Sequence, residues 1–167
     1  ENFSIVDGQP HSVYRYDAAS VRASIDESRR RLGRDTLDLV FIHSNGDDLA
    51  ILNESDAVET LTALRDAGTI HAIGLSGKTA EGFAQSFDWA DVAMIEYSSA
   101  APQLADTITL AQDRGISVVV KKALGSGHLP PEDALRFVLD HPGVNSAVVG
   151  TLNPHHMQAN IAAVCGG

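Results

Sequence analysis

Polar residues that can do chemistry follow each of the short apolar runs in this sequence. In chain order the runs end in His43-Ser44-Asn45, Ser76-Gly77-Lys78, Glu96-Tyr97-Ser98-Ser99, Lys121-Lys122 and Gly150-Thr151. Imidazole, hydroxyl and amine groups exchange protons and bind anions. Ligands of parallel α/β folds bind beyond the carboxyl ends of the strands, so the five endings predict one shared ligand site.

His43 and the pair Lys121 and Lys122 are the strongest candidates. A neutral imidazole at the end of an apolar strand can exchange a proton with a bound carbonyl group, and a histidine that only caps the core fits the same position equally well. The two lysines follow three valines. Consecutive strand residues point to opposite faces, so at most one of the two lysines lies inside. A solvated strand end is the alternative for this pair.

Two later segments predict a place for phosphate groups. Gly125-Ser126-Gly127 can bring backbone N–H groups close to an anion, although the same residues also form ordinary turns. Gly150-Thr151-Leu152-Asn153 joins a strand end to a helix expected to begin near Pro154, and a helix N-terminus offers free N–H groups to an anion. Asn153 also fits a simple N-cap. The last two loops of a β/α barrel meet and commonly bind phosphate.

Alternating helices and strands must position these residues. Each unit is an amphipathic stretch, a glycine, and an apolar run rich in β-branched residues. The predicted helices span about residues 17–33, 55–68, 79–87, 102–114, 132–141 and 154–164, and the predicted strands span about 37–43, 70–75, 92–97, 116–121 and 146–149. This pattern indicates a parallel sheet covered by helices, so the fold class is α/β. Residues 1–16 and 44–48 are predicted to be loops.

Composition and charge favour one packed domain and disfavour several classes of partner. The chain has 167 residues, 44% of them hydrophobic, and a formal net charge of −10, which predicts one packed domain over residues 1–167. The acidic balance disfavours nucleic acid and anionic membrane surfaces as partners. Cys165 is the only cysteine, which excludes an intramolecular disulfide and favours the cytoplasm. The sequence offers no ligand set for a metal and no nucleophile elbow or Walker loop.

Five motifs in order resemble the aldo-keto reductase family. The segment Ser20 to His43 is similar to the one that runs into the active-site histidine of those enzymes. The later motifs are Gly68-Thr69-Ile70-His71-Ala72-Ile73-Gly74-Leu75-Ser76, Ile95-Glu96-Tyr97-Ser98, Leu124-Gly125-Ser126-Gly127, and Val149-Gly150-Thr151 followed by Asn160. The resemblance implies a TIM (β/α)8 barrel, of which this chain supplies about the last five β/α units. It also implies NAD(P)H-dependent reduction of an aldehyde or ketone to an alcohol.

The same resemblance implies roles for individual residues. His43 matches the catalytic histidine that orients the substrate carbonyl, while the catalytic Asp, Tyr and Lys of the family would precede residue 1. Ser76 matches the serine that binds the nicotinamide carboxamide, and Lys121 stands where many members stack an aromatic ring on the nicotinamide. The matches to the pyrophosphate and adenosine contacts are Lys122, Leu124, Gly125, Ser126, Gly150, Thr151, Asn153 and Asn160.

The resemblance further implies a cofactor and partners. NADP is the expected cofactor, with NAD as the alternative, because Gly150 and His156 replace the Lys and Arg that often hold the 2′-phosphate. Five strands cannot close an eight-stranded barrel, so we expect a missing N-terminal half or a second copy to cover the sheet edges. The alternative function is a non-catalytic half barrel that self-associates or binds a partner chain and retains nucleotide binding. As a fragment, the chain alone is expected to be inactive.

Overall fold

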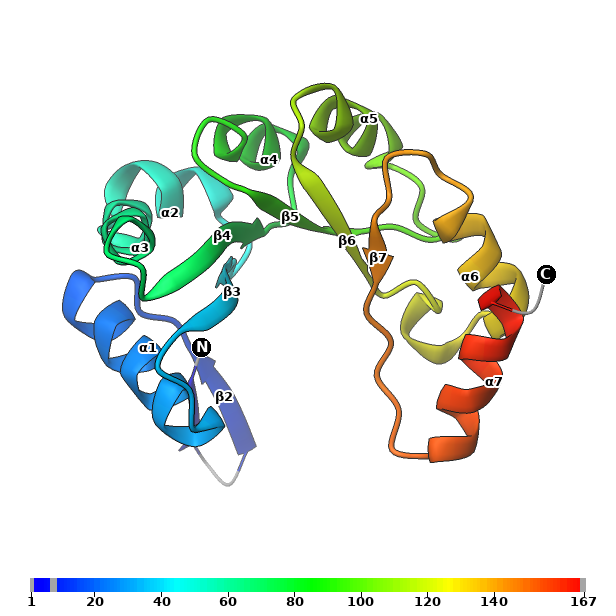
Figure 1. The fold of residues 1–167 in the computed structure, drawn as a ribbon, viewed down its shortest axis with the longest axis horizontal. Coiled ribbons are helices and arrows are strands. Elements are labelled where there is room, and N and C mark those ends of the chain that lie inside the picture. Colours follow the sequence, from blue (N-terminus) through cyan, green and yellow to red (C-terminus); the bar gives the residue numbers. More distant parts are fainter. Residues whose placement is uncertain (1, 7–8, 166–167) are drawn as a thin grey trace.

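A computed structural model of the chain describes residues 2–6 and 9–165. Its centre is a parallel sheet of five strands in the spatial order β3-β4-β5-β6-β7, the same order as in the sequence. The strands are β3 (Leu37–His43), β4 (Ile70–Ser76), β5 (Val92–Glu96), β6 (Ser117–Lys121) and β7 (Ser146–Ala147). The sheet curves into an open arch, as Figure 1 shows, and it does not close into a barrel within the described residues.

Helices cover the outer, convex side of this arch (Figure 1). They are α1 (Ala18–Leu32), α2 (Asp48–Glu54), α3 (Ala57–Asp66), α4 (Ala80–Ser86), α5 (Ala105–Asp113), α6 (Pro131–Leu139) and α7 (Pro154–Cys165), with the 3₁₀ turn η1 at Gly125–Gly127. Each parallel strand is thus followed by a helical crossover, as the sequence pattern predicts. The α/β class expected from the sequence is confirmed.

Local sequence signals fix the ends of α1. The Asp17 carboxylate caps the helix by accepting a hydrogen bond of 2.9 Å from the N–H of Ser20. Gly33 adopts a left-handed conformation, with φ at 62°, and its N–H bonds back to the carbonyl of Arg30. Glycine reaches this conformation without the steric strain of a Cβ. Both ends of this helix agree with the prediction.

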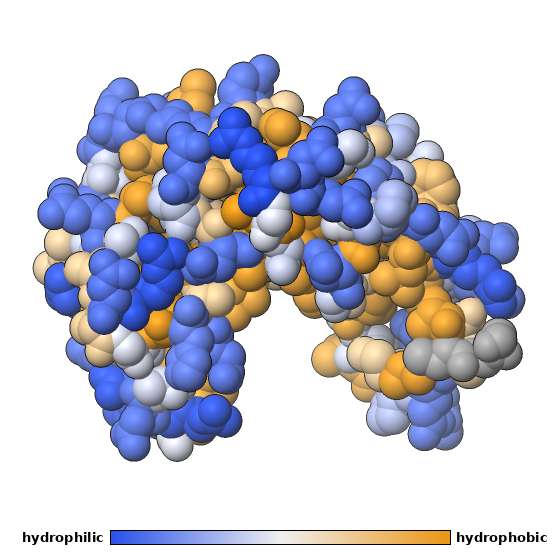
Figure 2. Space-filling view, turned by 45° about the horizontal axis from the view of Figure 1, so that its top comes forward, coloured by the Kyte–Doolittle hydropathy of each residue, from blue (hydrophilic) through white to orange (hydrophobic). Residues whose placement is uncertain are grey.

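The core lies between the sheet and the helices. Val118 and Val120 of β6 are fully buried there, as are Ile73 and Leu75 of β4. Burial of one such side chain contributes about 1.5–3 kcal/mol. Because strand residues alternate between faces, Lys121 lies on the other, concave face, where it is half-buried. Apolar surface is visible along this inner side of the arch in Figure 2.

The N-terminal segment differs from the prediction. The structure places an antiparallel hairpin, β1 (Asn2–Val6) and β2 (Gln9–Val13), where a long loop was expected. Residues 1, 7 and 8 of the predicted loop lie outside the described residues. Hairpin strands are held by backbone hydrogen bonds between neighbours in the chain and need no long apolar run, which is why the apolar pattern missed them.

The predicted loop at residues 44–48 and the last strand also need correction. Asp48 begins the short helix α2, which is capped by Asp47 through a bond of 3.3 Å from the N–H of Ala50. The described residues therefore hold seven α-helices rather than the predicted six. A helix of seven residues is too short for a reliable helical period. Strand β7 ends at Ala147, not at residue 149, although the N–H of Val148 still bonds to Val120.

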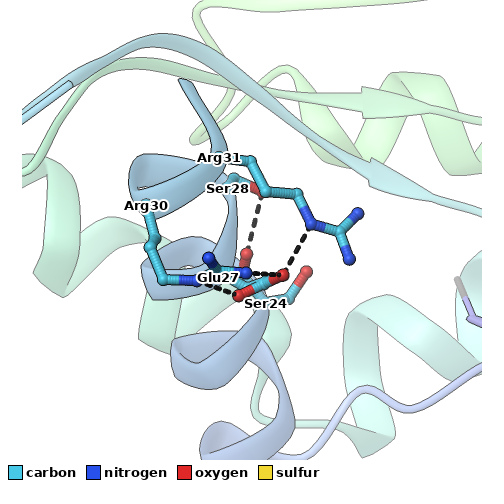
Figure 3. Close-up of polar contacts among 5 residues, drawn as sticks. All are labelled: Ser24, Glu27, Ser28, Arg30 and Arg31. Atoms are coloured by element: carbon cyan, nitrogen blue, oxygen red, sulfur yellow. Dashed lines mark hydrogen bonds and ion pairs between the residues drawn. The ribbon is translucent and has the colours of Figure 1, made fainter. Parts of the chain in front are cut away.

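The exposed face of α1 carries a cluster of charges rather than a ligand site. Glu27 accepts hydrogen bonds from Arg30 and from Arg31, and the hydroxyl of Ser28 bonds to the carbonyl of Ser24 (Figure 3). These bonds, that from Arg30 first, lower the pKa of Glu27 to about 2. Pairs at this spacing support a helix only weakly, because water and salt screen exposed charges. Among residues 2–6 and 9–165, no helix is both long and apolar enough to cross a membrane.

Candidate active site

Side chains from four neighbouring strands, β3 to β6, lie at the carboxyl ends on the concave face. His43 of β3 is the register partner of Ser76 of β4, and Glu96 of β5 is that of Lys121 of β6. The Lys121 side chain extends across β5 to β4, where its Nζ donates to Ser76 Oγ and to the carbonyl of Gly77, both at 2.9 Å. Two residues proposed from the sequence, Ser76 and Lys121, are therefore in direct contact.

The electrostatic surroundings of Lys121 favour its neutral form. Burial lowers the pKa of Lys121, and the charges of Lys122 and Lys78 act in the same direction. The carboxylates of Glu96 and Asp48 act in the opposite direction, but they do not cancel the effect of burial. Within the described residues Lys121 has no carboxylate at ion-pair distance. Lys121 is thus a lysine held by neutral oxygens.

Lys122 is placed differently from its neighbour. It is exposed and adopts a left-handed backbone conformation, with φ at 58°. Its Nζ bonds to Glu96 Oε2 at 2.6 Å. A left-handed conformation in a residue other than glycine is strained and is concentrated at functional loops. Of the two consecutive lysines, only Lys121 is directed across the concave face.

His43 is exposed at the end of β3, beside two tyrosines that the sequence analysis did not select. The Tyr16 hydroxyl donates to the carbonyl of His43 at 2.9 Å and accepts from the N–H of Asn45 at 3.1 Å. The Tyr14 ring lies nearly parallel to the imidazole, with centroids 6.2 Å apart. The tyrosines precede α1 in the segment expected to be a loop, so no periodic signal marked them.

Asp48 joins the loops after β3 and β4, and the sequence analysis missed it. Its side chain is 1% exposed. One carboxylate oxygen accepts a hydrogen bond from the hydroxyl of Ser44. The other accepts bonds from the N–H of Lys78 and of Thr79, both at 2.8 Å, and from the Thr79 hydroxyl at 2.9 Å. Burial raises the pKa of Asp48, but these hydrogen bonds outweigh it and the net pKa is lowered.

Two glycines make room for the Asp48 carboxylate. A Cβ on Gly77 would lie 2.9 Å from Asp48 Oδ2, and a Cβ on Gly82 would collide with the Asp48 side chain itself. Real Cβ atoms do not approach other atoms so closely. Gly77 and Gly82 thus leave the space that the buried carboxylate occupies. The relation cannot be recognised in the sequence, because the glycines and Asp48 lie in different segments of the chain.

The loops after β6 and β7 come together, as the strand-end rule predicts. They line a pocket of about 530 Å³ with α6 and α7. A second pocket, of about 300 Å³, shares three lining residues with it and extends toward Lys122. The predicted residues that line one or both pockets are Lys122, Leu124, Ser126, Gly150, Thr151 and Asn160. Asn160 is 7% exposed, which is low for an amide side chain.

Two other predicted contacts in these loops have features of their own: Asn153 is hydrogen-bonded within the chain, and Gly125 with Ser126 has an unusual backbone conformation. Asn153 caps α7, because its Oδ1 accepts from the N–H of His155 at 3.0 Å, and its own N–H bonds to Thr151 Oγ1 at 3.1 Å. Gly125 and Ser126 both have positive φ, at 53° and 59°. Successive residues of this kind turn the backbone sharply. Asn153 therefore contributes to the site through the position of α7.

All the lysines of this acidic chain lie at this end of the sheet. The sequence contains only Lys78, Lys121 and Lys122, and its other positive side chains are arginines. Lys78 follows β4, and its Nζ bonds to the carbonyl of Asn45 at 3.4 Å in the loop after β3. In a chain with a net charge of −10, this end of the sheet is therefore a place where an anion meets local positive charge.

The fold and this site place the chain among the β/α barrels, as about the last five units of one. The model of the Aldo/keto reductase family matches residues 6–133. The chain belongs to the aldo/keto reductase family, and its relatives are oxidoreductases.

Solved structures extend the comparison over the whole chain. A Pseudomonas aeruginosa protein assigned to the aldo-keto reductases superposes with a TM-score of 0.89 at 39% identity, over 98% of this chain and 63% of that one. The holo form of an aldo-keto reductase from Bacillus halodurans is similar in fold, with a TM-score of 0.79 at 22% identity, over 90% of this chain and 63% of that one. This chain thus spans less than two thirds of the length of each of these two proteins.

Two curated relatives also match most of this chain but only part of their own length. A pyridoxal 4-dehydrogenase from Microbacterium luteolum is 23% identical over 199 residues, which cover 89% of this chain and 58% of the relative. A D-threo-aldose 1-dehydrogenase from a Pseudomonas species is 26% identical over 124 residues, or 70% of this chain and 37% of the relative. Both relatives are named as dehydrogenases, one of pyridoxal and one of an aldose.

Proposed function

We propose that the protein containing this chain is an NAD(P)H-dependent reductase of aldehydes or ketones. The observation that carries the proposal is the convergence of the loops after β6 and β7 on a pocket of about 530 Å³ beside Lys122. The pocket has apolar walls and polar groups from Thr151 and Asn160, a combination that suits a nucleotide base and sugar. Membership of the aldo/keto reductase family supports the same conclusion.

Different residues along the strand ends would hold different parts of the cofactor and the substrate. Thr151 and Asn160 would hold the adenosine end, and Lys122 with the turn at Gly125 and Ser126 would hold the diphosphate. Ser76 would hold the carboxamide of the nicotinamide. The cofactor, when bound, supplies the hydride. His43 would orient the substrate carbonyl and stabilise charge on its oxygen, because an imidazole donates a hydrogen bond at neutral pH.

NADP is the proposed cofactor and NAD the alternative. The three lysines favour an additional phosphate by charge. His156 lies on α7 at the rim of the larger pocket, in place of an arginine that is always charged.

Replacing Lys122 with methionine is expected to weaken NADPH binding about fivefold, because a phosphate loses one exposed positive partner worth about 1 kcal/mol. Arg30→Met on α1 is the matched control. It removes the same charge from a residue that, like Lys122, is exposed and paired with a glutamate. The measurement is a fluorescence titration with NADPH. If the two variants bind NADPH equally well, Lys122 does not contact the cofactor.

The sheet edges are expected to have a partner. In the part of the chain that the structure describes, β3 and β7 each pair with a strand on one side only. Unpaired strand edges template further pairing, so we propose that either an N-terminal half of the same protein or a second copy covers them. Light scattering distinguishes the alternatives. A dimer mass for the 167-residue chain supports self-association and keeps the non-catalytic half barrel as the alternative function. A monomer mass excludes the self-associating half barrel and leaves only a different partner chain.

A further inference from the structure

We infer that Lys121 is a reactive amine that condenses with small aldehydes to form an imine, an activity separate from hydride transfer. This inference has only the aldehyde substrate class in common with the proposed function, because imine formation needs no dinucleotide.

The first argument is the hydrogen-bonding capacity of the Lys121 nitrogen. A neutral amine has two N–H donors and one lone pair, whereas an ammonium group has three donors and no acceptor. The structure provides two acceptors, Ser76 Oγ and the carbonyl of Gly77, both at 2.9 Å. They satisfy both donors of the neutral amine. The lone pair is then directed away from both acceptors.

The second argument is the contrast among the three lysines. Lys122 is exposed and bonds to a carboxylate, Glu96 Oε2, at 2.6 Å. Lys78 is exposed to solvent. Lys121 is half-buried and contacts neutral oxygens, and the lowered pKa caused by this burial increases the share of free amine at neutral pH. Lys121 is therefore expected to be the most nucleophilic lysine.

The third argument is the position of Lys121. Its side chain lies on the concave face at the carboxyl ends of the strands, where ligands of parallel α/β folds bind. Ser76 and its register partner His43 lie on the same face. A carbonyl compound that enters this site to meet His43 therefore reaches the neighbourhood of the amine.

The reaction balances with no further reagent. The Lys121 nitrogen attacks the aldehyde carbon and forms a C–N bond, while the electrons of the C=O π bond move to oxygen. The nitrogen gives up its two protons to that oxygen through solvent, the C–O bond breaks, and one water leaves as the C=N bond forms. Water reverses the reaction, so the imine is a reversible covalent form of the bound aldehyde.

Reductive trapping with propanal and sodium cyanoborohydride tests the inference. Propanal is uncharged and lacks recognition groups, so the labelling pattern reports the reactivity of each amine. The product of the whole reading frame is freed of small molecules, labelled at pH 7, and mapped by peptide mass spectrometry. We expect Lys121 to be modified several-fold faster than Lys122 or Lys78, because burial lowers its pKa and its nitrogen is held by neutral oxygens. The ratio should shrink as the pH rises, because the lowered pKa of Lys121 matters most near neutral pH.

Two matched variants locate the fast reaction. Lys121→Met should remove it, and Arg30→Met should leave it within about twofold, because Arg30 lies on α1, where it is paired with Glu27 and does not contact the site. Equal labelling of the three lysines, or slower labelling of Lys121, would overturn the inference. Because no dinucleotide is present, the labelling ratio does not depend on the proposed reductase activity. Failure of NADPH to bind in the titration would in turn count against that activity alone.

Discussion

Replacing Asp48 with alanine is expected to lower the free energy of unfolding by about 4 kcal/mol. The substitution leaves the N–H groups of Lys78 and Thr79 and the Ser44 hydroxyl without their buried acceptor. Each buried polar group left unsatisfied costs about 1–3 kcal/mol, and the removed atoms leave a cavity as well. Urea denaturation measures the loss.

Asp47→Ala is the matched control for Asp48→Ala. Asp47 is the neighbouring residue, is exposed, and makes one capping bond to Ala50. Loss of such a cap costs about 1 kcal/mol. Asp48→Asn should lose much less than Asp48→Ala, because the amide oxygen can accept from the same N–H groups and the amide nitrogen can donate to Ser44. If the alanine variants at 47 and 48 are equally stable, the carboxylate does not hold the two loops.

The contribution of Asp48 also has a defined pH dependence. Its pKa in the folded protein is lowered below the unfolded value of 3.8, so the folded state favours the charged form. The resulting stabilisation is fully present above that value and is lost as the pH falls through the folded pKa. The stability difference between the wild type and Asp48→Asn should therefore shrink as the pH falls below about 4 and through the folded pKa, where Asp48 becomes neutral like the asparagine.

Replacing His43 with alanine is expected to lower kcat for carbonyl reduction about 100-fold, the lower range for loss of a group that acts on the reacting atoms. The imidazole is at the end of β3 and is the register partner of Ser76. Since the proposed role of His43 is toward the substrate oxygen, the Kd for NADPH should change by less than about threefold. Steady-state kinetics with a small aldehyde, together with an NADPH titration, measures both quantities.

His71→Ala is the control for His43→Ala. His71 is also an exposed histidine on a strand, but it lies near the start of β4, at the opposite end of the sheet. It should leave kcat unchanged. Equal losses in the two variants would mean that His43 acts through the stability of the sheet rather than on the substrate.

Much of the fold could be predicted because the signals are local. Gly33 after α1, Asp17 before it and the apolar run of β6 are each recognisable within a few residues. The strand-end rule then identified His43, Ser76 and Lys121 as neighbours without any knowledge of their contacts. These predictions need only the periodicity of the chain and the geometry of parallel sheets.

The rest of the site depends on contacts between distant segments. Asp48 bonds to Thr79, 31 residues away, and Lys121 bonds to Ser76, 45 residues away and two strands over. Helix α2, which presents Asp48, is one of the shortest helices, and Tyr14 follows a hairpin that has no apolar period. Side-chain networks of this kind have no spacing rule, so a sequence pattern cannot reveal them.

Two sets of hydrogen bonds at the strand ends hold neighbouring strands of the arch together. Asp48 ties the loop after β3 to that after β4, and Lys121 ties β6 to β4 over the top of β5. The curvature of the sheet is thereby fixed before any further strand pairs with its edges. A partner that pairs with β3 would meet an edge whose following loop is already held in place, and it would not bear the entropic cost of ordering that loop.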